Sequence, residues 1–78
     1  MMLNAYYKEG CVVPIIAKGD DMSYDRVIYH RACDWCEKHM KPWTWRGQSR
    51  SDNTQGYYFA IIFQNKEDAL FFKLSVGV

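Results

Sequence analysis

The longest unbroken run of hydrophobic side chains lies at residues 57–63 and reads Tyr-Tyr-Phe-Ala-Ile-Ile-Phe. Successive side chains of a β-strand point to opposite faces of the sheet, so this run places apolar groups on both faces. Such a pattern is typical of a strand that is covered on both sides. We therefore predict that residues 57–63 form the central strand, around which the rest of the chain packs.

Between residues 23 and 40 the apolar positions follow the period of an α-helix. At about 100° per residue they occupy one half of the helix, and polar residues fill the other half apart from Val27. The apolar half consists of Tyr24, Ile28, Tyr29, Ala32, Cys33, Trp35, Cys36, His39 and Met40. Asp21 or Ser23 is expected to cap this helix, with Asp25 favouring its first turn. Pro42 is expected to end it.

Three shorter segments complete the middle of the chain. Residues 11–17 are strand-like, but Pro14 cannot donate to a ladder and therefore indicates an edge strand or a bulge. Residues 43–46 alternate in polarity and predict a strand with Trp43 and Trp45 on one face. Residues 47–56 contain no apolar side chain, which is typical of a long solvated hairpin loop.

A second helix is predicted to begin after Asn65, a favourable capping residue. This helix is short and apolar nearly all round, which is more surface than one sheet face can cover. We expect Leu70, Phe71 and Leu74 to form an interface that is buried by the N-terminal arm or by a second subunit. Residues 75–78 are a candidate for a last edge strand.

The expected order is strand, helix, strand, strand, helix and an optional last strand. This order predicts one α+β domain over residues 1–78, with a small antiparallel sheet and two helices on one face. The corresponding architecture is the ferredoxin-like, or split βαβ, plan. Residues 1–10 are expected to be either a mobile arm or an edge strand.

Composition agrees with a small folded domain. Of the 78 residues, 49% are hydrophobic and 17% aromatic, which argues against disorder. The net charge of +1 excludes a histone-like nucleic-acid binder and an acidic tail. Residues 38–51 nevertheless carry Lys38, Lys41, Arg46 and Arg50 without any acid, so a local basic patch is expected.

The chain contains three cysteines, Cys11, Cys33 and Cys36, an odd number that does not suit a secreted disulfide framework. We expect a cytoplasmic, soluble protein, because the start lacks a signal-peptide pattern and the longest apolar run is far shorter than the ~20 residues of a membrane helix.

A His-Cys-Cys-His series at spacing three, residues 30, 33, 36 and 39, resembles a zinc signature. On a helix, however, His30 and His39 would lie on opposite sides and could not share one ion. Cys33 and Cys36 remain as candidate ligands or as a redox pair, although such a pair needs a helix N-terminus to lower its thiol pKa. We expect them to be packing residues instead, with no bound metal or cofactor.

No catalytic triad, phosphate-binding loop or metalloprotease motif is present in the sequence. We therefore predict a non-enzymatic binding protein that pairs with itself or with a host protein. The alternative is single-stranded nucleic-acid binding, because aromatic rings can stack on bases while basic side chains meet phosphates. Its candidate residues are Trp43, Trp45, Arg46, Arg50, Tyr58 and Lys41, with Lys38 nearby.

Two resemblances accompany these patterns. Residues 56–63 followed by 65–69 resemble the third strand of an RNA-recognition motif and the turn into its second helix, and the family's two stacking aromatics then fall on Tyr58 and Ala60. The aromatic strand followed by residues 68–74, with Trp35 and Cys36 in the preceding helix, is similar to short uncharacterised proteins of tailed phages, notably marine ones. The second resemblance implies a small cytoplasmic protein that acts by binding inside an infected cell.

Overall fold

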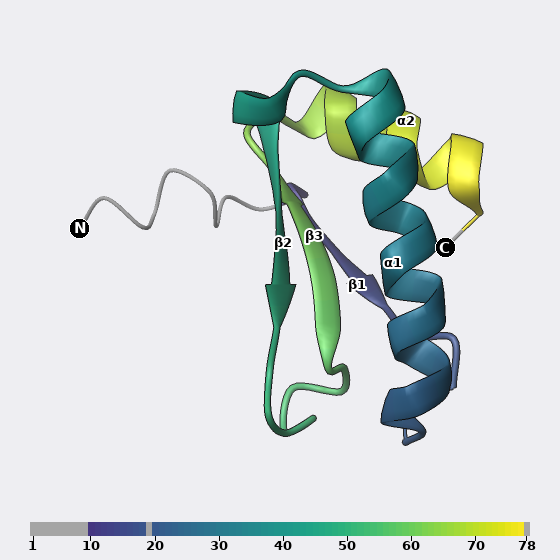
Figure 1. Ribbon diagram of the computed structural model, residues 1–78. Coiled ribbons are helices and arrows are strands. Elements are labelled where there is room, and N and C mark those ends of the chain that lie inside the picture. Colours follow the sequence, from purple (N-terminus) through teal and green to yellow (C-terminus); the bar gives the residue numbers. More distant parts are fainter. Residues whose placement is uncertain (1–9, 19, 78) are drawn as a thin grey trace.

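The structure, a computed structural model, describes residues 10–18 and 20–77 (Figure 1). Its elements in chain order are β1 (Val12–Ile15), α1 (Met22–His39), the short 3₁₀ helix η2 (Pro42–Thr44), β2 (Trp45–Ser49), β3 (Phe59–Phe63) and α2 (Lys66–Val76). The three strands form one sheet in the order β1-β3-β2, and both pairings are antiparallel. The predicted α+β class with a small antiparallel sheet is therefore confirmed.

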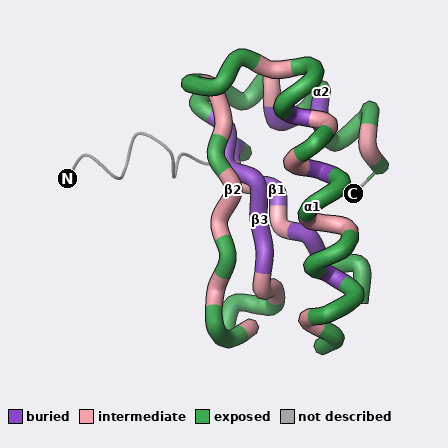
Figure 2. The backbone as a smooth tube through the Cα atoms, in the orientation of Figure 1, coloured by how far each residue is buried: buried purple, intermediate pink, exposed green. Residues whose placement is uncertain are grey.

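Strand β3 lies at the centre of the sheet, as the sequence predicts, but it begins at Phe59 and not at Tyr57. All five of its residues are buried, so both of its faces are covered (Figure 2). Phe59, Ile61 and Phe63 belong to the main core, together with residues of β1 and of both helices. Both helices lie on this side of the sheet (Figure 1).

Helix α1 begins and ends close to the predicted positions. The N–H of Tyr24 donates to Asp21 Oδ1 at 3.1 Å, which confirms Asp21 as the cap. The predicted buried half was too wide, since Tyr24 and His39 are exposed. Asp25, which we expected only to favour the first turn, is fully buried instead. It belongs to a narrower inward stripe with Ala32 and Cys36, spaced seven and four residues apart.

The prediction for residues 43–46 was wrong in its boundaries. Thr44 donates from its N–H and from its hydroxyl to the Lys41 carbonyl, at 3.0 and 2.7 Å, and Pro42 suits the first turn of a helix. Trp43 therefore lies in η2, and only Trp45 belongs to β2. Strand β2 continues through Ser49, inside the predicted loop, because β3 supplies ladder partners for these polar residues.

The C-terminal end of the chain differs from the prediction. Ser75 and Val76 are the last turn of α2, not an edge strand, and Gly77 ends the helix with φ at 81° and its N–H donating to the Lys73 carbonyl at 2.9 Å. Val78 and residues 1–9, where an arm or edge strand was expected, lie outside the described residues. Asn65 caps α2 as predicted, accepting from the Asp68 N–H at 2.9 Å.

Candidate interaction surface

Among the described elements, α2 carries the most exposed large apolar side chains, and they lie on its outer side. Ala69 and Phe72 point to the core and are fully buried. Leu70, Phe71 and Leu74 are 55%, 53% and 78% exposed. Their spacing of one, three and four residues places them on the side of the helix turned away from the sheet. The structure thus brings together the three residues that the sequence predicts as an interface, and we call them the α2 outer face.

Trp35 of α1 extends this surface. Its ring centre lies 5.6 Å from that of Phe71 and 5.6 Å from that of Phe72, and it stacks on His39 at 4.5 Å. Because Trp35 is only half-buried, it forms a border between the core and the α2 outer face. The helical period of the sequence placed Trp35 with the core residues. Its contact with Phe71 depends on how α1 and α2 pack on each other, and the sequence pattern of one helix does not give this packing.

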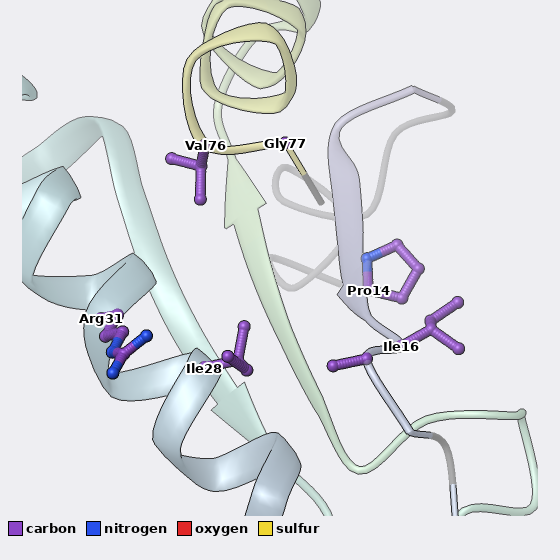
Figure 3. A pocket seen from close by; sticks show the side chains of 7 residues that line it. Pro14, Ile16, Ile28, Arg31, Val76 and Gly77 are labelled. Carbon is purple, nitrogen blue, oxygen red and sulfur yellow. The ribbon is translucent and has the colours of Figure 1, made fainter.

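An open groove of about 480 Å³ lies between β1, α1 and the C-terminal end of α2 (Figure 3). Its lining is apolar apart from one guanidinium and consists of Pro14, Ile16, Ala17, Ile28, Arg31, Val76 and Gly77. Among the described residues, no second polar side chain lines the groove to orient a small molecule, so this lining offers mainly apolar contact surface.

The residues that suggested nucleic-acid binding are divided between the two faces of the sheet. Trp45 lies opposite Phe63 and packs against the core on the helix-covered face, whereas Arg46 lies opposite Ile62 on the other face. The Trp45 indole N–H is buried and has no acceptor in the described part of the chain. On the face that carries Arg46, the central Ala60 and Ile62 are fully buried. Stacking on bases requires exposed rings beside basic groups, and the described residues do not provide both at the centre of either face.

The remaining candidates form small separate groups: Lys41 with Trp43, Arg50 with Tyr58 through a backbone hydrogen bond, and Lys38 apart on α1. Trp43 is 64% exposed in η2, with Lys41 Nζ 5.6 Å from its ring centre. Arg50 follows β2 and forms an ion pair with Asp52 at 3.8 Å. Tyr58 packs against the core. Lys38, in the last turn of α1, is exposed on the helix. The structure therefore does not gather the seven residues into one binding surface.

The pKa values of the Cys33 and Cys36 thiols are shifted toward the protonated form. Burial raises the pKa of Cys36 to about 12, and the neighbouring Cys33 adds to this effect. Burial also raises the pKa of Cys33, with smaller contributions from Asp34 and Glu37, while a hydrogen bond to Tyr29 opposes the shift. A redox pair needs the opposite shift, because the thiolate is the nucleophile. All three cysteines are free.

The described residues form neither a metal-binding cluster nor a membrane-spanning helix. Among residues 10–18 and 20–77, no three His, Cys, Asp or Glu side chains converge as ligands would. Neither described helix has the length and apolar character to cross a bilayer.

Comparison with protein-family models, curated proteins and solved structures finds no match to the chain.

Proposed function

We propose that the protein is a small, non-enzymatic binding protein that holds another protein through the α2 outer face. The proposal rests on the exposure of three large apolar side chains on one side of one helix. Each is more than half exposed, and they are Leu70, Phe71 and Leu74. Contiguous apolar groups of this kind on a small domain mark interaction sites. Burying one such side chain fully is worth about 1.5–3 kcal/mol.

The fold supports this proposal by placing α2 against the sheet through one side only. Strands β1 and β2 are both antiparallel to β3, which lies between them. We propose the ferredoxin-like plan on this basis, because a split βαβ unit has the same strand order and strand directions. The described residues contain no fourth strand. Ala69 and Phe72 anchor α2 to the sheet and leave its opposite side available. The free cysteines suit a reducing compartment, so we place the protein in the cytoplasm.

The charges beside the α2 outer face favour a partner of different sequence. Lys66 and Lys73 lie four residues before and three residues after Leu70, so both are its neighbours on one side of the α2 outer face. The exposed Glu67 lies three residues before Leu70 and adds one acidic group at the N-terminal end of this face. In an antiparallel pair of α2 helices, Lys66 of one copy would face Lys73 of the other. This like-charge contact is unfavourable. An apolar helix with acidic residues along the border that meets Lys66 and Lys73 would instead complement the surface.

A synthetic peptide tests whether acidic flanking residues strengthen binding to the α2 outer face. The probe is a synthetic amphipathic helix with leucine at the a and d positions and glutamate at the flanking positions, and the reference is the same peptide with lysine in place of glutamate. Isothermal titration calorimetry should show that the glutamate peptide binds about tenfold or more tightly than the lysine peptide. Leu74→Glu should abolish binding, because it places a charge at the centre of the contact.

The matched control is Val27→Glu. Val27 is 50% exposed on α1 and lies eight residues before Trp35, the α1 residue that contacts Phe71, so this variant should bind like the wild type. If neither peptide binds, or if Leu74→Glu and Val27→Glu have the same effect, the proposal is wrong.

A further inference from the structure

The two edges of the sheet differ in their capacity to pair with another strand. Phe63 donates its N–H to the Cys11 carbonyl at 2.9 Å. Bonded and non-bonded positions alternate along an antiparallel ladder, so Val13 also pairs with β3, whereas Val12 and Pro14 direct their backbone groups outward. Pro14 has no N–H, which leaves the β1–β3 ladder intact but interrupts the outer edge of β1.

The outer edge of β2 carries no proline. Gln64 donates its N–H to the Thr44 carbonyl at 2.9 Å, and Arg50 donates its N–H to the Tyr58 carbonyl at 2.7 Å. The same alternation then directs the N–H and C=O groups of Trp45, Gly47 and Ser49 away from β3. Three consecutive outward positions with both groups present form a regular template for strand addition.

The sequence of β2 is compatible with antiparallel pairing to a second copy of itself. With a two-fold axis at Gly47, the bonded pairs are Gly47 with Gly47 and Trp45 with Ser49. Arg46 then lies opposite Gln48 of the other copy, so no like charges face each other directly. Gly47 also holds Tyr29 of α1 close by, since a Cβ at this position would collide with the Tyr29 hydroxyl.

Charged residues of α1 lie on both sides of the contact between Tyr29 and Gly47. On either side of the Tyr29–Gly47 contact, a hollow separates α1 from the β2 edge. The charged and titratable residues that line the hollow at the Ser49 end are Arg26, His30 and Arg50, and those that line the hollow at the Trp45 end are Glu37 and Arg46. A two-fold axis at Gly47, perpendicular to the sheet, keeps both α1 helices on the same side and brings the Arg26 end of one copy to the Glu37 end of the other.

We propose that two copies of the chain pair through their β2 strands to form a continuous six-stranded antiparallel sheet, with Arg26 of each copy bonded to Glu37 of the other. Both α2 helices remain uncovered, since α1 contacts Gly47 of β2, whereas α2 contacts β1 and β3. The dimer would thus present two α2 outer faces, although its formation does not depend on their function.

A charge-swap series tests the proposed contact. Sedimentation velocity over a wide concentration range should show a monomer–dimer equilibrium for the wild type. Arg26→Glu and Glu37→Arg should each raise the dissociation constant about tenfold, because each places two like-charged contacts in the dimer. The double variant Arg26→Glu/Glu37→Arg should restore the wild-type value. Asp34→Arg makes the same charge change on the outward side of α1 and should leave the equilibrium unchanged.

Cross-linking tests the register. Residues 46 and 48 of opposite copies would form a non-bonded antiparallel pair with Cα atoms about 4.5 Å apart, within the range of a disulfide. Mixing Arg46→Cys with Gln48→Cys protein and oxidising should therefore give one defined cross-linked dimer, in higher yield than either variant alone.

Three results would contradict the proposed dimer. The first is a wild-type protein that stays monomeric at every concentration. The second is an equal change of the dissociation constant in Glu37→Arg and Asp34→Arg, and the third is a dimer that is dissociated by Leu74→Glu but not by the charge reversals. The last result would move self-association to α2, whereas failure of peptide binding alone would leave the β2 pairing standing.

Discussion

Asp25 is fully buried and joins two parts of the fold. The backbone N–H of Lys18 donates to its Oδ1 at 2.8 Å, so the carboxylate ties the segment after β1 to the first turns of α1. A buried acidic group needs such partners, because an unpaired one would carry a large desolvation cost.

Replacing this acceptor should destabilise the protein. We expect Asp25→Ala to lower the free energy of unfolding by about 1–3 kcal/mol, since the Lys18 N–H loses its acceptor. Asp25→Asn keeps an oxygen at the same position and should cost less. Urea denaturation followed by tryptophan fluorescence measures both. Equal stability of wild type and Asp25→Ala would show that this hydrogen bond is not important for the fold.

At the scale of elements, α2 depends on its ends more than a longer helix would. Only Ala69 and Phe72 of its 11 residues are fully buried, and short helices are marginal without tertiary packing. Asn65 and Gly77 satisfy backbone groups at the two ends. The presentation of the α2 outer face therefore depends on these caps.

Asn65→Ala should accordingly lower the free energy of unfolding by about 0.5–2 kcal/mol, because the Asp68 N–H loses its side-chain acceptor. Gln64→Ala is a suitable control, since Gln64 is exposed and bonds to Thr44 through its backbone. Thermal unfolding followed by circular dichroism distinguishes the two. A Gln64→Ala effect as large as that of Asn65→Ala would argue against a capping role.

At the scale of the whole molecule, the protonated groups between α1 and the sheet link stability to alkaline pH. Burial, with contributions from Cys33, raises the pKa of Tyr29 from 10.0 to about 12. The pKa of Cys36 rises from 9.0 to about 12. In this range the unfolded chain releases protons that the folded chain retains, so stability falls as pH rises.

We therefore expect full stability below about pH 9 and a progressive loss between about pH 9 and 12. Chemical denaturation at several pH values measures this dependence. Tyr29→Phe removes one of the titrating groups and should make the loss shallower. A stability that does not change over this range, or an unchanged slope in Tyr29→Phe, would contradict the assignment.

Several features were determined by the sequence alone, because they follow from local chemistry. An apolar residue at every position of 59–63 leaves no polar face, so this strand had to be central. Asp21 and Asn65 accept backbone N–H groups within their own helical turns, and Pro14 lacks an N–H wherever it lies. The exposed Leu70, Phe71 and Leu74 follow from the same local reasoning, since a helix with apolar side chains all round cannot bury them on one sheet.

Only the tertiary structure decided the rest. Whether residues 47–49 form a strand or a loop depended on ladder partners in β3, which are distant in sequence. The burial of Asp25 depended on the Lys18 N–H, and the different faces of Trp45 and Arg46 depended on where β2 begins. These outcomes depend on hydrogen bonds and packing between segments that meet only after folding. The sequence therefore specified the central strand and the helix starts, and tertiary pairing decided which polar residues joined the sheet, the core or the surface.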